Sequence, residues 1–193
     1  TKVTRVAHMA TPAFNSVLNP PFPIDAAELS GLRAVVLADV DAEALSFQGR
    51  NSLHRFAEAG GTVLVLGGWV SYGESKMEDT FLEEMLPVTS PGSFDHERCK
   101  KPLPLTPAAD WVAGQGLPWK EAPSVLWMHR LTPKPGTKVL VTAGGKPFLV
   151  SGACGKGKVI ACAGTVLGTA PAGTKVFWGW SGWPQLLAKC LSQ

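Results

Sequence analysis

The sequence predicts a three-layer, flavodoxin-like α/β domain with a mostly parallel sheet and an antiparallel hairpin extension. In the first half of the chain, short runs of β-branched residues alternate with helical patterns, which is typical of parallel strands joined by crossover helices. In the second half, three strand-like runs follow one another with glycine-rich turns between them, which favours hairpins. The 193 residues suffice for one core, so we expect residues 1–193 to form a single domain.

The parallel part is predicted from two runs that are apolar on both faces. These runs are residues 34–38 (Ala-Val-Val-Leu-Ala) and residues 62–66 (Thr-Val-Leu-Val-Leu). A strand with no polar face must be covered on both sides, as in a sheet between two helical layers. Weaker strands are expected over residues 3–8 and 125–130.

The antiparallel extension is predicted from strands over residues 138–142, 148–150 and 158–163. Gly144-Gly145 and Gly155-Lys156-Gly157 separate them and indicate hairpin turns. The second turn is not a phosphate-binding loop, because it lacks the four-residue spacer and the Ser or Thr after Lys.

Helix boundaries are predicted from capping patterns. Asp25-x-x-Glu28 begins a short helix that ends at Gly31, and Thr80 begins another with the same pattern. Residues 50–59 place their apolar side chains on one face, and Pro184 fits the first turn of a final helix. The proline-rich stretch from residue 88 to 123 is predicted to be a long loop with a short helix around residues 108–113.

Composition excludes several classes of partner. The net charge is +3 with both signs interspersed, which does not favour nucleic acid or an anionic membrane. No apolar run has the length of a membrane-spanning helix. We therefore expect a cytoplasmic protein without a cofactor. Because charged residues make up only 17% of the chain, we also expect a partner to cover part of its surface.

The cysteines predict neither a metal site nor a redox motif. The four thiols form no C-x-x-C pair and no zinc-type cluster with histidine. Reduced thiols are the rule in a cytoplasmic-type protein. They are Cys99, Cys154, Cys162 and Cys190.

Several segments resemble the class I glutamine amidotransferase-like family. Residues 56–69 resemble its helix–Gly-Gly–strand–Gly-Gly stretch, and residues 70–73 and 80–88 resemble a subgroup related to trehalose-utilisation-type proteins. Shorter matches follow nearly to the end of the chain, at residues 38–40, 133–136, 155–159 and 180–183. The family's first strand and helix have no counterpart before residues 3–8. The chain is therefore expected to be part of a longer polypeptide, or to fill that gap with another segment.

The resemblance implies a nucleophilic cysteine on the tight turn after residues 62–66. This chain has Gly67-Gly68-Trp69 there, and none of its cysteines follows that strand. An indole has no nucleophilic atom and no titratable proton near neutral pH. We therefore expect no glutaminase activity.

A ligand crevice is predicted where strands 34–38 and 62–66 end. Open α/β sheets bind ligands at the carboxyl ends of their parallel strands. This rule places Asp39, Gly67, Gly68 and Trp69 on one rim, and Ser71 and Glu74 follow within a turn. Asp39 could instead cap the next turn, and Glu74 could be a solvated loop residue.

A second hypothesis is a hydrolase with a rearranged site of Ser71, Asp39 and His129. It needs a base within hydrogen-bonding reach of the serine. Ser71 could instead cap the following turn, and His129 could be a packed, hydrogen-bonded residue. A third hypothesis is a purely structural domain of a larger protein.

The C-terminal tryptophans predict an interface. Trp178, Trp180 and Trp183 fall within six residues with glycines between them, which is hard to bury in one small core. We expect this segment to contact another copy of the chain or the remainder of a larger polypeptide.

Overall fold

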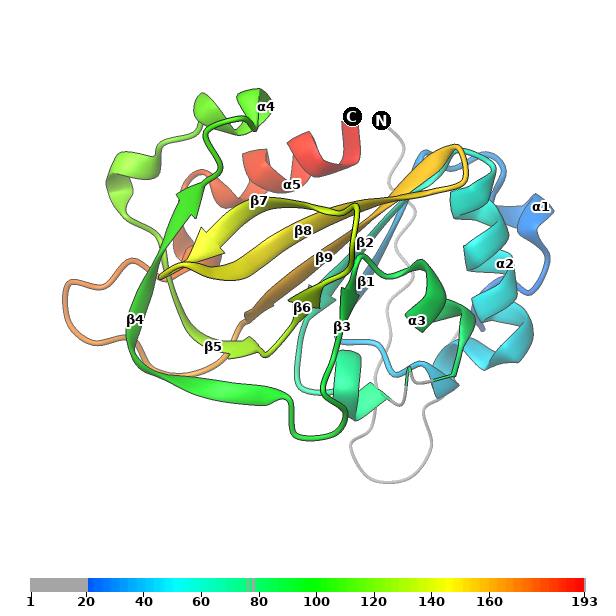
Figure 1. The fold of residues 1–193 in the computed structure, drawn as a ribbon, viewed down its shortest axis with the longest axis horizontal. Helices are drawn as coiled ribbons and strands as arrows, with labels where there is room; N and C mark the ends of the chain where they lie inside the picture. Colours follow the sequence, from blue (N-terminus) through cyan, green and yellow to red (C-terminus); the bar gives the residue numbers. More distant parts are fainter. Residues whose placement is uncertain (1–20, 76, 78, 193) are drawn as a thin grey trace.

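The computed structural model describes residues 21–75, 77 and 79–192. The main sheet has seven strands in the order β1-β2-β9-β5-β4-β7-β8, and β8 also pairs with β9 (Figure 1). The strands are β1 (Ala34–Ala38), β2 (Thr62–Gly67), β4 (His96–Pro107), β5 (Ser124–His129), β7 (Lys138–Ala143), β8 (Lys146–Cys154) and β9 (Gly157–Thr165). A separate small sheet pairs β3 (Val88–Thr89) with β6 (Thr132–Pro133).

The predicted fold class is wrong. Strands β9, β5, β4, β7 and β8 form a closed ring in which every pairing is antiparallel. The body of the molecule is therefore a closed antiparallel β-barrel, and not a mostly parallel flavodoxin-like sheet between two helical layers. Parallel pairing is confined to β1, β2 and β9, where residues 34–38 lie against residues 62–66 as expected.

The error arises from β4, which lies inside the stretch that was predicted to be a loop. Prolines usually argue against a strand because they cannot donate to the ladder. Here Pro102 lies where the register with β5 shifts, between Arg98 and Leu103. Pro104 contributes its carbonyl oxygen, which accepts a hydrogen bond from Gly144 N at 3.0 Å. By pairing with both β5 and β7, β4 closes the ring.

The two predicted hairpins are confirmed. Ala143 pairs with Lys146 across Gly144-Gly145, and Cys154 pairs with Gly157 across the second turn. Gly144, Gly145 and Gly155 have positive φ, a conformation that glycine adopts without steric cost.

The helices are α1 (Ala26–Leu29), α2 (Ser46–Glu58), α3 (Phe81–Met85), α4 (Val112–Gln115) and α5 (Trp183–Ser192). Single 3-10 turns occupy residues 43–45, 72–75, 119–121 and 177–179. The predicted N-caps are confirmed, because Asp25 accepts from Ala27 N and Thr80 accepts from Glu83 N. Helix α2 begins earlier than predicted, at Ser46.

The core lies on both sides of β2. Residues 62–65 are all buried, which requires cover on both faces of this strand. Helices α2 and α5 both contact β2, and α2 also contacts β9. The turn at the carboxyl end of β2 therefore projects from a strand that is packed on both faces.

The C-terminal tryptophans pack into this core more than expected. Trp180 is 2% exposed, and its indole N–H donates to Pro118 O at 3.1 Å. The Phe177 ring contacts Trp178 and Trp183 at centroid distances of 5.0 Å and 4.8 Å. Trp178 and Trp183 stay half-buried, so these two of the three C-terminal tryptophans keep side-chain surface that a partner could contact.

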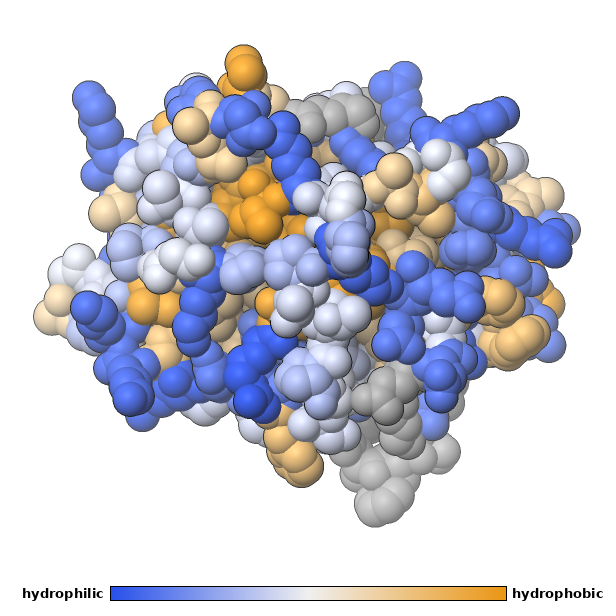
Figure 2. Space-filling model, viewed as in Figure 1, coloured by the Kyte–Doolittle hydropathy of each residue, from blue (hydrophilic) through white to orange (hydrophobic). Residues whose placement is uncertain are grey.

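Hydrophobic residues gather near the centre of the face shown in Figure 2, and hydrophilic residues form most of its outline. Within the described part of the chain, no helix is long and apolar enough to cross a membrane. The strand expected over residues 3–8, and whatever fills the expected gap beside it, lie outside the described residues.

Candidate functional site

A cavity of about 300 Å³ opens at the carboxyl ends of the three parallel strands. We call it the crevice. It is lined by residues 38–39 at the end of β1, 66–69 at the end of β2 and 164–167 at the end of β9, together with Phe177 and Trp183. Parallel strands share a direction, so the carboxyl ends of β1, β2 and β9 meet at one edge.

Asp39 lies on the rim of the crevice and holds the turn after β2. Its Oδ1 accepts a hydrogen bond from Val70 N at 2.7 Å. Its backbone has a φ of 53°, the left-handed region that aspartate tolerates better than most residues. The carboxylate is exposed and keeps further lone pairs that can accept from a ligand.

The two glycines after β2 are required by close approaches. A methyl group on Gly68 would lie 2.2 Å from Asp39 Oδ1, and one on Gly67 would lie 2.7 Å from Gly164 O. Only glycine therefore lets β1 and β9 close on this turn. Trp69 follows with 60% of its side chain exposed, and it forms a flat wall of the crevice.

Ser71 and Glu74 do not line the crevice, although both were predicted to add contacts there. Ser71 is 1% exposed, and its hydroxyl donates to Leu66 O at 3.0 Å. A Glu74 oxygen accepts from Phe94 N at 2.5 Å. Both residues thus stabilise the turn and the loop that faces it.

His129 forms a fully buried pair with Asp95, a partner that the sequence did not reveal. His129 Nδ1 lies 2.8 Å from Asp95 Oδ1, and His129 Nε2 lies 3.0 Å from Gly68 O. A carbonyl oxygen can only accept, so Nε2–H donates to Gly68 O, and Nδ1 forms the hydrogen bond to the Asp95 carboxyl group. Both ring nitrogens are therefore engaged, and neither can act as a base toward Ser71.

Tyr72 ties the same turn to strands β2 and β9 through its side-chain hydroxyl. Its hydroxyl lies 3.0 Å from both Val65 O and Cys162 O, and its ring contacts His129 at 4.9 Å between centroids. Burial raises the pKa of Tyr72 well above its ordinary value, so this group is a neutral hydrogen-bond donor. The turn after β2 thus rests on buried polar groups whose hydrogen bonds are satisfied.

An aromatic stack supports the Trp69 wall. The His96 ring lies 5.7 Å from Trp69 and stacks on Trp127 at 5.0 Å. Its Nε2 is buried without a hydrogen-bond partner. Burial and the neighbouring His129 lower the pKa of His96, although Asp95, Asp39 and Glu74 oppose this shift. His96 is therefore neutral at pH 7. Like His129's partner Asp95, it lies in the stretch that was predicted to be a loop.

Six non-glycine residues of the described chain have positive φ, and three of them lie in the turn after β2 or bond to it. Asp39, Tyr72 and Phe94 all have φ between 53° and 61°. Positive φ is uncommon for residues other than glycine and costs most for bulky aromatics. Phe94 is also 81% exposed, so burial of its own ring does not offset this strain. Such outliers cluster at functional sites more often than elsewhere.

Thr165, at the end of β9, adds a polar group that the sequence analysis overlooked. It lines the crevice, is 3% exposed, and its hydroxyl has no hydrogen-bond partner. A buried hydroxyl without a partner is destabilising unless something bonds to it. The end-of-strand rule that identified Asp39 would have found Thr165 too, because it closely follows the predicted strand.

None of the four cysteines lines the crevice. Burial raises the pKa of Cys162 and of Cys190 to about 12. Burial also raises the pKa of Cys99 and of Cys154. All four are protonated thiols at neutral pH, and a thiol is a poor nucleophile compared with a thiolate.

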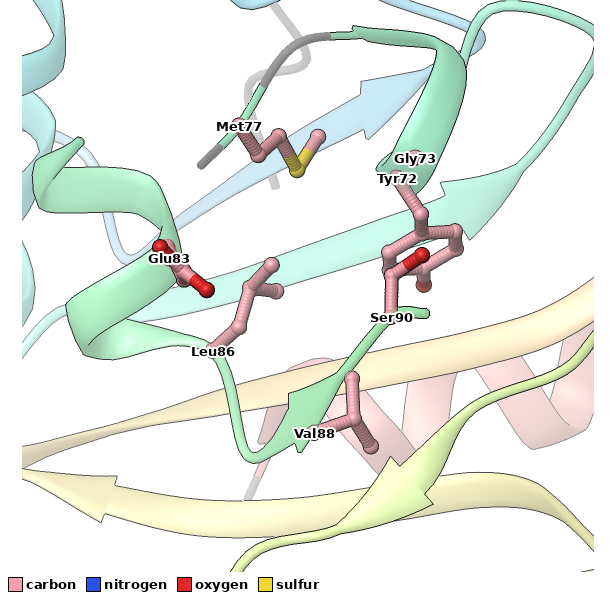
Figure 3. Close-up of a pocket in the computed structure, with 7 residues that line it drawn as sticks. All are labelled: Tyr72, Gly73, Met77, Glu83, Leu86, Val88 and Ser90. Carbon is pink, nitrogen blue, oxygen red and sulfur yellow. The ribbon is translucent and has the colours of Figure 1, made fainter. Parts of the chain in front are cut away.

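A second cavity, of about 20 Å³, lies between the turn after β2 and helix α3. In Figure 3 the side chains of Tyr72, Leu86 and Val88 surround it, with Ser90 at one side. This volume suits about one water molecule. It is too small for an organic ligand. No group of three or more potential metal ligands occurs among the described residues.

Comparison with known proteins supports the family resemblance. The family described as "Putative glutamine amidotransferase" (GATase1_like) matches residues 3–193. A search of curated proteins finds no match.

Two solved cytoplasmic proteins of Salmonella typhimurium are similar in structure. STM3548 is 20% identical with a TM-score of 0.77, and the match covers 88% of this chain and 74% of that one. STM1381 is 23% identical with a TM-score of 0.75, covering 88% and 75%. A β-galactosidase from Bacillus circulans is 16% identical with a TM-score of 0.52, covering 70% of this chain and 20% of the enzyme. At these identities the likeness shows a shared fold alone.

Proposed function

This chain belongs to the putative glutamine amidotransferase family, and we propose that it binds a small ligand at the crevice without glutaminase chemistry. The observation that carries the proposal is Trp69, which stands on the turn where the family resemblance implies a cysteine. The same residue forms a wall of a 300 Å³ cavity. One substitution thus accounts for the loss of a nucleophile and for a surface on which a ligand can pack.

The hydrogen-bond geometry supports binding over turnover. The hydrolase alternative needs a free base beside Ser71, but both nitrogens of His129 are engaged and the Ser71 hydroxyl bonds to Leu66 O. The crevice itself offers a carboxylate at Asp39 and a buried hydroxyl at Thr165 among apolar side chains. A mostly apolar pocket with a few polar groups is the usual form of a small-molecule site.

The first test is ammonia release from glutamine. We expect none above background from the purified chain. Release that is lost when one of Cys99, Cys154, Cys162 or Cys190 is changed to Ser would overturn the non-catalytic half of the proposal.

The second test is a thermal-shift screen of small metabolites on the wild type and on Asp39→Ala. Compounds that bind in the crevice should raise the Tm of the wild type and raise it less in the variant, because Asp39 lines the cavity. Compounds that shift both proteins equally would place the binding site elsewhere.

We propose further that the protein acts in the cytoplasm, as the two Salmonella proteins are described, and that its C-terminal segment contacts a partner. Trp180 is buried within the chain, so the interface proposal rests on the half-buried Trp178 and Trp183. Sedimentation tests it with a matched pair. Trp178→Ala should reduce the sedimenting mass, and Val112→Ala, at a side chain that is 81% exposed elsewhere on the surface, should leave it unchanged. A monomeric wild type would contradict self-association.

A further inference from the structure

The charge of the crevice restricts what it can hold. Asp39 carries the one charged side chain among the residues that line it, all of which lie in the described part of the chain. Glu74 lies near enough to raise the pKa of His96, as Asp39 does, so a second carboxylate contributes to the local field. His96 is neutral at pH 7, and no lysine or arginine is among the lining residues. The lining of the crevice therefore carries a negative charge, although the whole chain has a net charge of +3.

The aromatic side chains of the lining also favour a positively charged ligand. Trp69, Phe177 and Trp183 contribute rings to the crevice. Trp69 meets His96 edge-on, at an interplanar angle of 77°, and 60% of its side chain stays exposed. The face of an aromatic ring attracts cations, and tryptophan does so most strongly. A carboxylate beside exposed indole suits a positive charge carried on an apolar body.

One feature near the crevice favours the opposite charge, and it is the weaker one. Helix α5 begins at Trp183, and a helix N-terminus carries about half a positive charge. Pro184 has no N–H, and Trp183 N already donates to Trp180 O at 3.0 Å. Two backbone donors of the first turn are thus unavailable, whereas Asp39 contributes a full negative charge.

Resting on the proposed function, we infer that the ligand of the crevice is a small organic cation, an ammonium group with an apolar body. Asp39 and the face of Trp69 recognise the charge. The apolar lining, which includes Leu66, Val166 and Leu167, surrounds the body of the ligand. The volume of about 300 Å³ is at the lower end of the range for ligand pockets, which limits the ligand to a small molecule.

The test compares choline with 3,3-dimethylbutan-1-ol, which has the same shape with carbon in place of the charged nitrogen. Binding of each to the full chain is measured by isothermal titration calorimetry at constant ionic strength, with sodium chloride as the reference salt. We expect choline to bind at least about tenfold more tightly than the neutral compound, because the compound loses both the Asp39 and the Trp69 attraction.

Two variants separate charge from shape. Asp39→Asn keeps an oxygen that can accept from Val70 N and tolerates the left-handed backbone, so it removes only the charge. It should weaken choline binding by about fivefold and leave the neutral compound unchanged. Trp69→Leu keeps an apolar wall and should weaken choline more than the neutral compound. The matched control is Asp110→Asn, the same change outside the crevice, and it should alter neither affinity.

Equal affinity for the two compounds, or choline binding that Asp39→Asn leaves unchanged, would overturn the inference. If neutral metabolites bind at the crevice in the thermal-shift screen and choline does not, the cation inference fails and the proposed function stands. If no compound of either kind binds there, both fail.

Discussion

The crevice and the hairpins between β7, β8 and β9 obey local structural rules to different degrees. In the hairpins, glycines occupy the positive-φ positions and the strands pair antiparallel, with register shifts between β7 and β8. In the turn after β2 and the residues that bond to it, aspartate, tyrosine and phenylalanine occupy such positions. Polar side-chain atoms of His96 and Thr165 are buried without partners, as is Lys158 Nζ near the hairpin end of β9. Both regions share β9, so the contrast lies at the two ends of one strand.

This contrast separates a part of the molecule that only needs to be stable from a part that holds features costly to stability. Local violations are expected at functional sites and are tolerated when the surroundings over-determine them. Here the surroundings are the His129–Asp95 pair, which bonds to Gly68 O, and the Tyr72 hydroxyl, which ties the turn to carbonyl groups of β2 and β9.

The largest expected effect comes from removing one member of the buried pair. His129→Ala removes a fully buried ring and leaves the Asp95 carboxyl group without its hydrogen-bond partner, which should together cost about 3–5 kcal/mol of unfolding free energy. The comparison in the hairpin region is Lys146→Ala, which breaks a half-exposed ion pair with Glu97 and should cost at most about 1 kcal/mol. Urea unfolding of both variants measures the difference. Similar losses would mean that the turn after β2 does not depend on the pair.

A smaller effect is expected from Gly68→Ala. The added methyl group would collide with Asp39 and break its bond to Val70 N, so the variant should lose about 1–3 kcal/mol and its ligand-induced Tm shift. Gly116→Ala is the control, because Gly116 has open space around it and a φ of −80° that alanine adopts. That variant should keep its stability or gain up to about 1 kcal/mol. A Gly68→Ala protein that binds ligands like the wild type would show that this turn does not shape the crevice.

Thr165→Val should stabilise the ligand-free protein, whereas the two preceding substitutions destabilise it. Replacing a buried, unpartnered hydroxyl with a methyl group removes a polar group that nothing in the protein satisfies. The ligand-free protein should gain about 1 kcal/mol of unfolding free energy. If ligands use the hydroxyl, the same variant should show a smaller ligand-induced Tm shift. Lower stability of the free variant would show that the hydroxyl is satisfied in solution.

The smallest effect concerns pH. Burial lowers the pKa of His96 in the folded state below its unfolded value near 6.5. Between these two values the unfolded chain binds more protons, so this contribution to stability is present above pH 6.5 and is lost as the pH falls toward the folded pKa. His96→Phe keeps an aromatic ring against Trp69 and Trp127 without a titrating group. Denaturation at pH 7.5 and 5.5 should show a smaller decrease in the variant, and equal decreases would contradict this assignment.

Much of the crevice lining could be predicted from the sequence, because its residues adjoin strands that are recognisable from short apolar runs. Asp39, Gly67, Gly68 and Trp69 follow directly after apolar runs, and parallel strands bring such positions to one edge. Their placement around one cavity matches that expectation. What they bind stays a prediction.

The parts that could not be predicted depend on long-range pairing. Asp95 and His129 are 34 residues apart, and nothing in either neighbourhood identifies the other. Strand β4 contains three prolines that argue against a strand locally. Its two neighbouring strands override that preference, and without β4 the closed ring could not be inferred. Ser71 was misplaced because a residue two positions beyond Trp69 already turns inward to bond with Leu66 O.

The central claim is that ligands bind at the crevice, and the indole N–H signals of the seven tryptophans test it most directly. Compounds that raise the Tm of the wild type would be titrated into ¹⁵N-labelled protein and followed by two-dimensional NMR. Trp69 and Trp183 line the crevice, whereas Trp111 and Trp119 lie outside its lining. We predict that the Trp69 and Trp183 signals move while those of Trp111 and Trp119 stay in place. Movement of Trp111 and Trp119 with Trp69 and Trp183 unchanged would contradict the account.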